Sequence, residues 1–146
     1  MKVRFKKLSP QAIVPTYAHN GDACFDIYAL GDMEKPVDIR PGGAAAIPTG
    51  ISFEVPMGYV MLVFSRSGHG FKHGVRLGNA VGVIDAGYRG ELQVALHNDG
   101  RARFKVAHGD RIAQAMIIPR PAIELEEAGE LSDTSRGTAG LGSTGS

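Results

Sequence analysis

Short apolar runs, most of them closed by a glycine or a proline, recur along this chain of 146 residues. Within the runs, apolar and polar residues alternate or β-branched residues cluster, a pattern typical of β-strands. No window of about 11 residues or more keeps the period of an amphipathic helix. At most a helical turn or two is therefore expected, over residues 67–72. The pattern predicts strands over residues 3–8, 25–29, 44–48, 51–55, 59–64, 92–96, 103–106, 112–118 and 122–125.

This succession of short strands predicts an all-β domain, either a sandwich or a barrel, and the length suits a single domain. The segment 132–146 differs, because Ser, Thr and Gly dominate it and its only apolar residues are Ala139 and Leu141. Such a segment cannot form a core, and taken alone it is typical of a frayed tail. We predict a β domain over residues 1–131 and a glycine-rich arm over residues 132–146.

Charge and cysteine content exclude several kinds of partner. Sixteen Lys and Arg against fifteen Asp and Glu give a formal net charge of +1, which provides no global field for nucleic acid or for an anionic membrane. The basic residues of segment 2–7 alternate with apolar ones, as on the solvent face of a strand. Cys24 is the only cysteine, so an internal disulfide is excluded. With no leader segment and no apolar run of membrane-spanning length, we expect a cytoplasmic protein.

The segment 78–90, which reads G-N-A-V-G-V-I-D-A-G-Y-R-G, is the most informative for function. Its branched apolar residues favour a strand, while its glycines let the chain turn back and let a ligand approach closely. We predict a hairpin-like pocket that presents Asp85 and Tyr88. From the residues alone, Asp85 is either a general base or the cap of a turn, and Tyr88 either contacts a sugar or is a half-buried strand tyrosine.

Five segments in order carry a resemblance to a known family. They are P-T-Y-A-H-N-G-D-A-C-F-D-I-Y-A (15–29), S-R-S-G-H-G-F-K-H-G (65–74), the segment 78–90, G-D-R-I-A-Q-A-M-I (109–117) and R-G-T-A-G-L-G-S-T-G (136–145). Through them the chain resembles the trimeric dUTP pyrophosphatases (dUTPases). The resemblance implies a distorted jelly roll, a homotrimer with shared active sites, and Mg²⁺-dependent hydrolysis of dUTP to dUMP and pyrophosphate. That activity keeps uracil out of DNA and supplies dUMP for dTMP synthesis.

The resemblance also assigns roles to the third motif. Asp85 becomes the base that activates a water for attack on the α-phosphorus. Tyr88 lies against the deoxyribose and leaves no room for a 2′-hydroxyl. Uracil is recognised by Asn79, whose amide offers both donors and an acceptor, and by backbone groups that include Gly82 and Val83. Alone, an Asn after a glycine is a turn signal.

The implied polyphosphate contacts come from three other motifs: Arg66, Ser67, Gly68 and Gln114, with Arg136, Gly140, Leu141 and Gly142 of the arm. Guanidinium groups and the backbone N–H groups of glycine-rich turns suit phosphate oxygens. By pattern alone, residues 66–68 are a loop with a surface arginine, and Gln114 is equally a solvent-facing strand residue. Asp26 is expected near Mg²⁺, through a water or by positioning an arginine, since Mg²⁺ takes its main ligands from phosphates and water.

A zinc site is not expected at His69 and His73. The two are four residues apart, but Gly70 and Gly74 argue against the helix that would place both on one face.

Three positions depart from the common family pattern. Gly87 stands at the second acidic place of the third motif, His69 where a small apolar residue is usual, and Leu141 where an aromatic ring stacks on uracil. Two alternative functions follow from the same fold. A dCTP deaminase would carry its glutamate at the position of Ala95, so its acid/base group is absent here. A nucleotide-sensing module would bind without turnover, which the intact motif residues disfavour.

Overall fold

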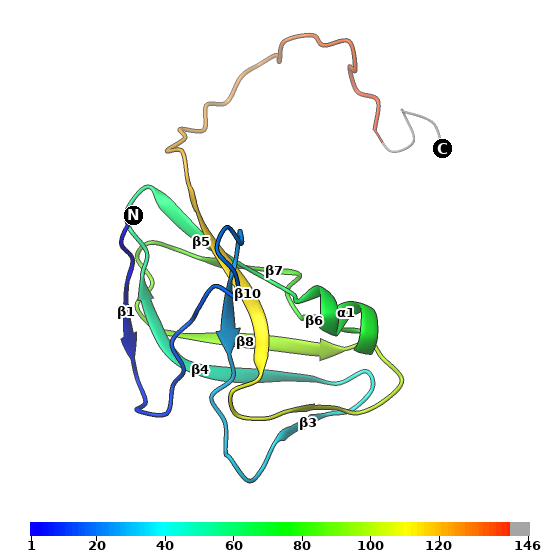
Figure 1. The fold of residues 1–146 in the computed structure, drawn as a ribbon. Coiled ribbons are helices and arrows are strands. Elements are labelled where there is room, and N and C mark those ends of the chain that lie inside the picture. Colours follow the sequence, from blue (N-terminus) through cyan, green and yellow to red (C-terminus); the bar gives the residue numbers. More distant parts are fainter. Residues whose placement is uncertain (141–146) are drawn as a thin grey trace.

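The computed structural model describes residues 1–140, and it consists of two antiparallel four-stranded sheets packed face to face (Figure 1). One sheet has the order β1 (Arg4–Lys7), β4 (Ala44–Glu54), β8 (Glu91–Asn98), β6 (Val75–Leu77). The other has the order β2 (Phe25–Tyr28), β10 (Arg111–Pro119), β5 (Tyr59–Phe64), β7 (Val81–Ile84). A two-stranded ribbon joins β3 (Val37–Ile39) to β9 (Phe104–Val106). The predicted all-β fold is confirmed.

The core lies between the two sheets, where inward-facing residues of each strand meet. Ile47 and Leu96 from one sheet and Met61 and Ile112 from the other are almost completely buried. Along β8, buried and less buried positions alternate, as a strand with one face on the core requires. The alternating sequence of β8 therefore corresponds to its core-facing side, on which Leu92, Val94 and Leu96 are buried.

The two strands predicted over 44–48 and 51–55 form a single strand, β4, with a register shift against β8 between Pro48 and Ser52. Gly50 lies in this shift with φ +67, and a Cβ atom there would come within 2.8 Å of Ala12 Cβ and Leu30 Cδ2. The glycine that suggested a break is thus a bulge inside one strand.

The predicted helical segment is confirmed as α1 (Ser67–His73), which lies beside β6 at one end of the sandwich (Figure 1). It ends at Gly74, which adopts a left-handed conformation with φ 67 and donates its N–H to the Gly70 carbonyl. A Cβ at this position would lie 2.9 Å from the backbone of Gly100. Close packing as well as backbone conformation therefore requires a glycine at the end of α1.

The hairpin predicted for segment 78–90 is wrong. β7 pairs with β5, whereas β8 pairs with β4 and β6, so the two strands belong to different sheets. The turn between them crosses from one sheet to the other, and the space that the segment encloses lies between the sheets.

The strand predicted over 122–125 is also wrong for this chain. β10 ends at Pro119, and residues 120–140 contain neither helix nor strand and are exposed throughout. In Figure 1 this segment leaves the sandwich as an extended trace, coloured orange to red. The predicted boundary after residue 131 stays a prediction, and Leu141 and Gly142 lie outside the described residues. Within residues 1–140, no helix is long and apolar enough to cross a membrane.

Candidate active site

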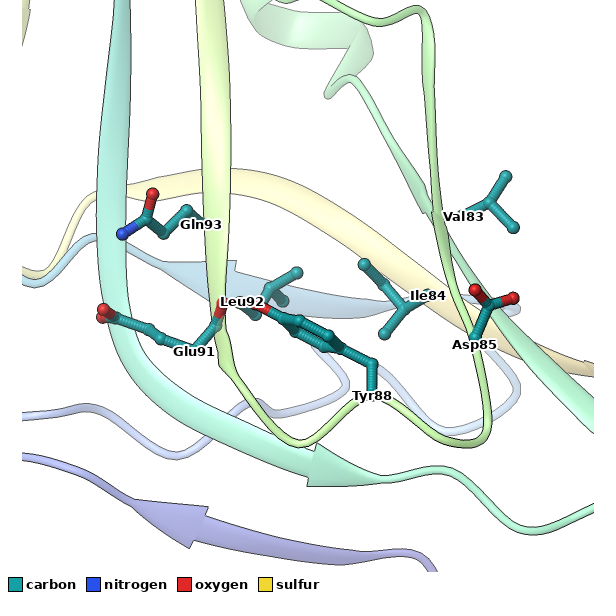
Figure 2. Close-up of a pocket in the computed structure, with 7 residues that line it drawn as sticks. All are labelled: Val83, Ile84, Asp85, Tyr88, Glu91, Leu92 and Gln93. Atoms are coloured by element: carbon teal, nitrogen blue, oxygen red, sulfur yellow. Dashed lines mark hydrogen bonds between the residues drawn. The ribbon is translucent and has the colours of Figure 1, made fainter.

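Asp85 and Tyr88 line one pocket of about 420 Å³ at the turn from β7 to β8. The other lining residues are Val83, Ile84, Glu91, Leu92 and Gln93. In the view of Figure 2, the Tyr88 ring lies between Leu92 and Ile84, and the Asp85 carboxylate is at the right, on the side of Val83. Strands from both sheets therefore contribute walls.

The Asp85 carboxylate is exposed, and it takes part in none of the hydrogen bonds formed among residues 1–140. The turn is closed instead by the backbone, since the Tyr88 N–H donates to the Asp85 carbonyl at 3.1 Å. The carboxylate does not cap this turn, and both of its oxygens remain available to accept a hydrogen bond from a water or a ligand.

Tyr88 is fixed by a hydrogen bond and by a glycine. Its hydroxyl donates to the Glu91 carbonyl at 2.9 Å, which folds the ring back over the turn. The ring lies so close to Gly90 that a Cβ atom there would be 2.5 Å from Tyr88 Cζ. Tyr88 as a residue is 45% exposed, so it can contact a ligand in the pocket.

A smaller cavity of about 120 Å³ lies deeper between the sheets and shares Val83, Ile84, Leu92 and Gln93 with the first pocket. Its own lining includes Asn79, Gly82 and Ala95. The two spaces therefore adjoin, and the smaller one combines the Asn79 amide with apolar lining residues.

The turn that carries Asn79 is tight. Ala80 has φ 59, which is unusual for a residue with a Cβ, and the Val81 N–H donates to the Asn79 carbonyl at 2.6 Å. Such strained turns cluster at ligand sites. At Gly82, a Cβ would lie 3.1 Å from Val63 Cβ, so glycine allows β7 to approach β5 closely here.

A second group of predicted residues gathers around Asp26 on β2. Its side chain is 12% exposed and faces two guanidinium groups, with Arg66 Nε 3.4 Å from Oδ1 and Arg111 Nη1 3.3 Å from Oδ2. Gln114 on β10 is the cross-strand neighbour of Asp26 and donates to the Ser65 carbonyl at 3.3 Å. Gln114 is thus half-buried rather than solvent-facing.

Ser67 and Gly68 are exposed in the first turn of α1, immediately after Arg66. The N–H groups of a helix's first turn have no acceptor inside the helix, and a Cβ at Gly68 would meet open space. These donors immediately follow Arg66, the residue that precedes α1.

The two groups are far apart within one chain. β7 pairs with β5 so that Ile84 lies opposite Met61 and Val81 opposite Phe64. Asp85 therefore lies beyond one end of the pairing and Arg66 beyond the other, separated by about six strand residues or about 20 Å. A single chain brings Asp85 and Tyr88 together at one end of this pairing, whereas Asn79 precedes β7 and lies at the same end as Arg66.

The described residues of the arm, 132–140, extend away from the sandwich and from both groups (Figure 1). Arg136 Nε donates to the Ala139 carbonyl at 3.0 Å within its own turn, and Gly140 is exposed. Sequence reasoning missed the second arginine on Asp26, Arg111, although it lies inside the fourth motif. It also missed Glu91 and Gln93, for which no sequence signal distinguished pocket positions from ordinary strand positions.

The prediction that Gly70 and Gly74 prevent a helix that places both histidines on one face is wrong, because α1 forms with Gly70 inside it and carries His69 and His73 on one face. Their ring centroids are 6.3 Å apart, and His69 Nε2 lies 2.8 Å from the Arg111 carbonyl oxygen. No cluster of three or more His, Cys, Asp or Glu in the described part of the chain is arranged to hold a metal ion. Asp26 does not fit a direct magnesium ligand either, because both of its oxygens face arginines.

Comparisons with known proteins agree on one family. A family model described as dUTPase matches residues 10–145. A deoxyuridine 5′-triphosphate nucleotidohydrolase of Gloeothece citriformis is 43% identical over 145 residues, which cover 99% of this chain and 97% of that protein. The protein of the same name from Clostridioides difficile is 44% identical over 143 residues, covering 98% and 97%.

Solved structures give the same result. The dUTPase of Staphylococcus bacteriophage 80alpha with dUpNHpp has a TM-score of 0.89 and 30% identity, and the match covers 99% of each chain. A mutant dUTPase from phage phi11 of S. aureus, reported to reveal the coordination of a structural Mg(II) ion, has a TM-score of 0.80 and 27% identity, covering 89% of this chain and 98% of that one. With five motifs in order, a matching fold and relatives along its whole length, the chain belongs to the dUTPase family.

Proposed function

We propose that this chain hydrolyses dUTP to dUMP and pyrophosphate, with Asp85 as the general base. The observation that carries the proposal is a pair of adjoining spaces, one lined by Asp85 and Tyr88 and the other by Asn79, Gly82 and Val83. Hydrolysis of a nucleotide requires a carboxylate for the attacking water, a surface for the sugar and polar groups for the nucleobase. Asp85, Tyr88 and Asn79 can supply these three in turn. Membership of the dUTPase family and a phage relative with bound dUpNHpp support the same substrate.

Asp85 acts on the attacking water. The carboxylate accepts a proton as the water oxygen forms its bond to the α-phosphorus, and the bond from that phosphorus to the bridging oxygen breaks to release pyrophosphate. A base that already accepted hydrogen bonds from its own turn would be a poorer proton acceptor. The lack of such bonds at Asp85 favours this role.

Nucleoside recognition follows from the inner cavity and the ring. The Asn79 amide pairs with the uracil edge, together with the backbone at Gly82 and Val83, and the Tyr88 ring excludes a 2′-hydroxyl. Ala95 lines the inner cavity where a deaminase would need its glutamate. This lining disfavours deamination of dCTP.

The triphosphate is bound by Arg66, Ser67, Gly68 and Gln114 of a second copy of the chain, in a homotrimer with shared sites. Asp85 and Arg66 are separated by about 20 Å along the paired strands. This separation supports shared sites, since the two side chains of one chain cannot both contact the phosphates of the same nucleotide. The arm adds Arg136, Gly140, Leu141 and Gly142 to a neighbouring site. Its extension away from its own sandwich, visible in Figure 1, favours such a reach.

The exposed segment after β10 offers a further reason for assembly. Ile123 and Leu125 are 76% and 90% exposed and alternate with acidic residues. The edge strand β1 alternates basic residues with Phe5, which is itself exposed. Opposite charges and matching apolar faces favour strand pairing between copies, so the strand that failed to form within one chain is proposed to form between two.

Mg²⁺ is proposed to be held by substrate phosphates and water rather than by a protein cage. Asp26 positions Arg66 and Arg111 and contributes to the metal only indirectly. When bound, the ion neutralises charge on the polyphosphate. We also propose a cytoplasmic location, for which the single reduced cysteine is the support.

The test is pyrophosphate release from dUTP, dCTP, dTTP and UTP with Mg²⁺, for the wild-type chain and Asp85→Asn. We expect release from dUTP alone, lowered about 10²–10⁴-fold in the variant, with nucleotide binding retained. Tight dUTP binding without release in the wild-type chain would instead favour a nucleotide-sensing module. Retention of more than about a tenth of the wild-type turnover by the variant would remove Asp85 from the role of base.

A further inference from the structure

His69 lies where α1 meets the start of β10. It is half-buried, and its Nε2 is 2.8 Å from the carbonyl oxygen of Arg111. A carbonyl oxygen only accepts hydrogen bonds, so Nε2 must carry the proton. The imidazole is therefore a donor to β10, from a position 42 residues earlier in the chain.

The same carbonyl accepts a second hydrogen bond, from Arg66 Nη1 at 3.1 Å. The two lone pairs of one oxygen allow both bonds. Arg66 and Arg111 also both face Asp26 through their guanidinium groups. Arg66 is therefore held by two groups, the Asp26 carboxylate and the Arg111 carbonyl oxygen. His69 is held by the same carbonyl oxygen.

The ring of His69 is oriented by packing. It meets Phe104 of β9 edge to face, with centroids 5.1 Å apart. The register of β10 with β2 shifts between Arg111 and Ala113, and such irregularities interrupt the regular ladder of backbone bonds. The Arg111 carbonyl at the start of β10 thus accepts hydrogen bonds from side chains. The packing against Phe104 fixes the direction from which His69 donates.

We propose that His69 is a positioning residue for phosphate binding: by donating to the Arg111 carbonyl it locks the first turn of α1, and with it Arg66, Ser67 and Gly68, against β10. This inference rests on the proposed function, because it takes the first turn of α1 as the polyphosphate site. His69 itself contacts no phosphate. A side chain without a donor at this position leaves only Arg66 to tie the loop to that carbonyl.

His73 provides a matched control. It lies one turn further along the same face of α1 and packs on the same ring, with centroids 5.4 Å from Phe104. Within the part of the chain that the structure describes, its imidazole forms none of the hydrogen bonds. Substitution of His73 therefore removes comparable packing and leaves the contact with β10 intact.

The experiment compares His69→Leu, His69→Gln and His73→Leu with the wild-type chain. Affinity for inorganic pyrophosphate is measured by calorimetry, and KM and kcat are measured for dUTP. His69→Leu is expected to weaken pyrophosphate binding and to raise KM by about three- to tenfold, the range that one net hydrogen bond supplies. His69→Gln, which keeps an N–H donor, is expected to restore most of that loss, and His73→Leu is expected to leave both values within about twofold.

Equal losses in His69→Leu and His73→Leu, or no rescue by His69→Gln, would show that His69 only packs, and would overturn the inference. A ¹H–¹⁵N spectrum that places the imidazole proton of His69 on Nδ1 would do the same. Failure of the proposed function is distinguishable: a wild-type chain that binds pyrophosphate but does not hydrolyse dUTP refutes the activity, while the pyrophosphate affinities still decide the role of His69. A chain that binds neither ligand overturns both.

Discussion

The position of the Tyr88 ring depends on the absence of a side chain at Gly90. An alanine Cβ at Gly90 would lie 2.5 Å from Tyr88 Cζ and 2.9 Å from Cε2. Carbon atoms in ordinary contact are about 3.5–4.0 Å apart, so the ring would have to move by about 1 Å. Such a movement breaks the 2.9 Å bond from the hydroxyl to the Glu91 carbonyl. Loss of that bond costs about 0.5–1.5 kcal/mol.

We expect Gly90→Ala to lower the preference for dUTP over UTP by about fivefold, the factor that corresponds to about 1 kcal/mol. A displaced ring no longer fills the space in which a 2′-hydroxyl would lie. The φ of Gly90 is outside the left-handed region, so alanine adds no backbone strain of its own. The measurement is the ratio of kcat/KM for the two nucleotides in a competition assay.

Gly87 is the matched control, because it lies in the same turn and a Cβ there would meet nothing within 4 Å. Gly87→Ala should keep the wild-type ratio. An unchanged ratio in Gly90→Ala would refute the reasoning, since it would mean either that the ring does not exclude the 2′-hydroxyl or that its place is not set by this contact. Lowered ratios in both variants would point instead to a general effect on the turn.

Four further outcomes are expected. Mixing an Asp85→Asn chain with a chain truncated after Arg136 should restore activity that neither has alone, and mixtures without activity would contradict shared sites. Leu141→Phe should raise kcat/KM for dUTP by up to about tenfold, since base stacking contributes about 1–3 kcal/mol; an unchanged value would mean that this side chain does not cover the base. Gly50→Ala should lower the free energy of unfolding by about 1–3 kcal/mol in urea titrations, because the new Cβ would crowd Ala12 and Leu30 and the position has a positive φ. Burial raises the pKa of the Cys24 thiol, so its thiolate fraction at neutral pH is below that of a free cysteine and iodoacetamide should modify it more slowly.

The local pattern of apolar and polar residues predicted most strands of this fold. It failed where the presence of a pairing partner decides whether a segment forms a strand. The alternation in segment 122–125 is a genuine strand pattern, but no edge of the same sandwich takes it up, and Ile123 and Leu125 remain exposed. The sequence predicted two strands in place of β4, because a glycine at position 50 suggests a break. Its contacts with Ala12 and Leu30 in the folded chain are not visible in the sequence. A bulge and a loop have the same local composition, and only the packing around the glycine distinguishes them.

The site divides in the same way. Asp85 and Tyr88 could be found together because they lie three residues apart in one turn, and Asn79 could be found because the same short segment carries it before β7. Arg111 and His69 could not, because their partners are remote: Arg111 meets Asp26 across 85 positions, and His69 meets Arg111 across 42. The sequence places both within motifs, but contacts of this range depend on the order of the strands in the sheet.

The distance between the two halves of the site makes catalysis a property of the proposed assembly. The turn from β7 to β8 carries the groups for sugar and water, whereas α1 and β10 carry those for phosphate, at the other end of the pairing between β5 and β7. Asn79, proposed to recognise the base, lies in the turn that precedes β7. Substitutions on the turn therefore alter which nucleotide is selected, and substitutions at the contact of α1 with β10 alter how firmly the polyphosphate is held. In a closed trimer, each subunit contributes its catalytic turn to one site and its phosphate-binding residues to another. A chain with a substitution in one of these groups can therefore form an active site with a neighbour that is substituted only in the other. The arm, which leads away from its own sandwich over residues 120–140, is proposed to add a third contribution. This arrangement makes turnover depend on subunit association even though each subunit contains every required residue.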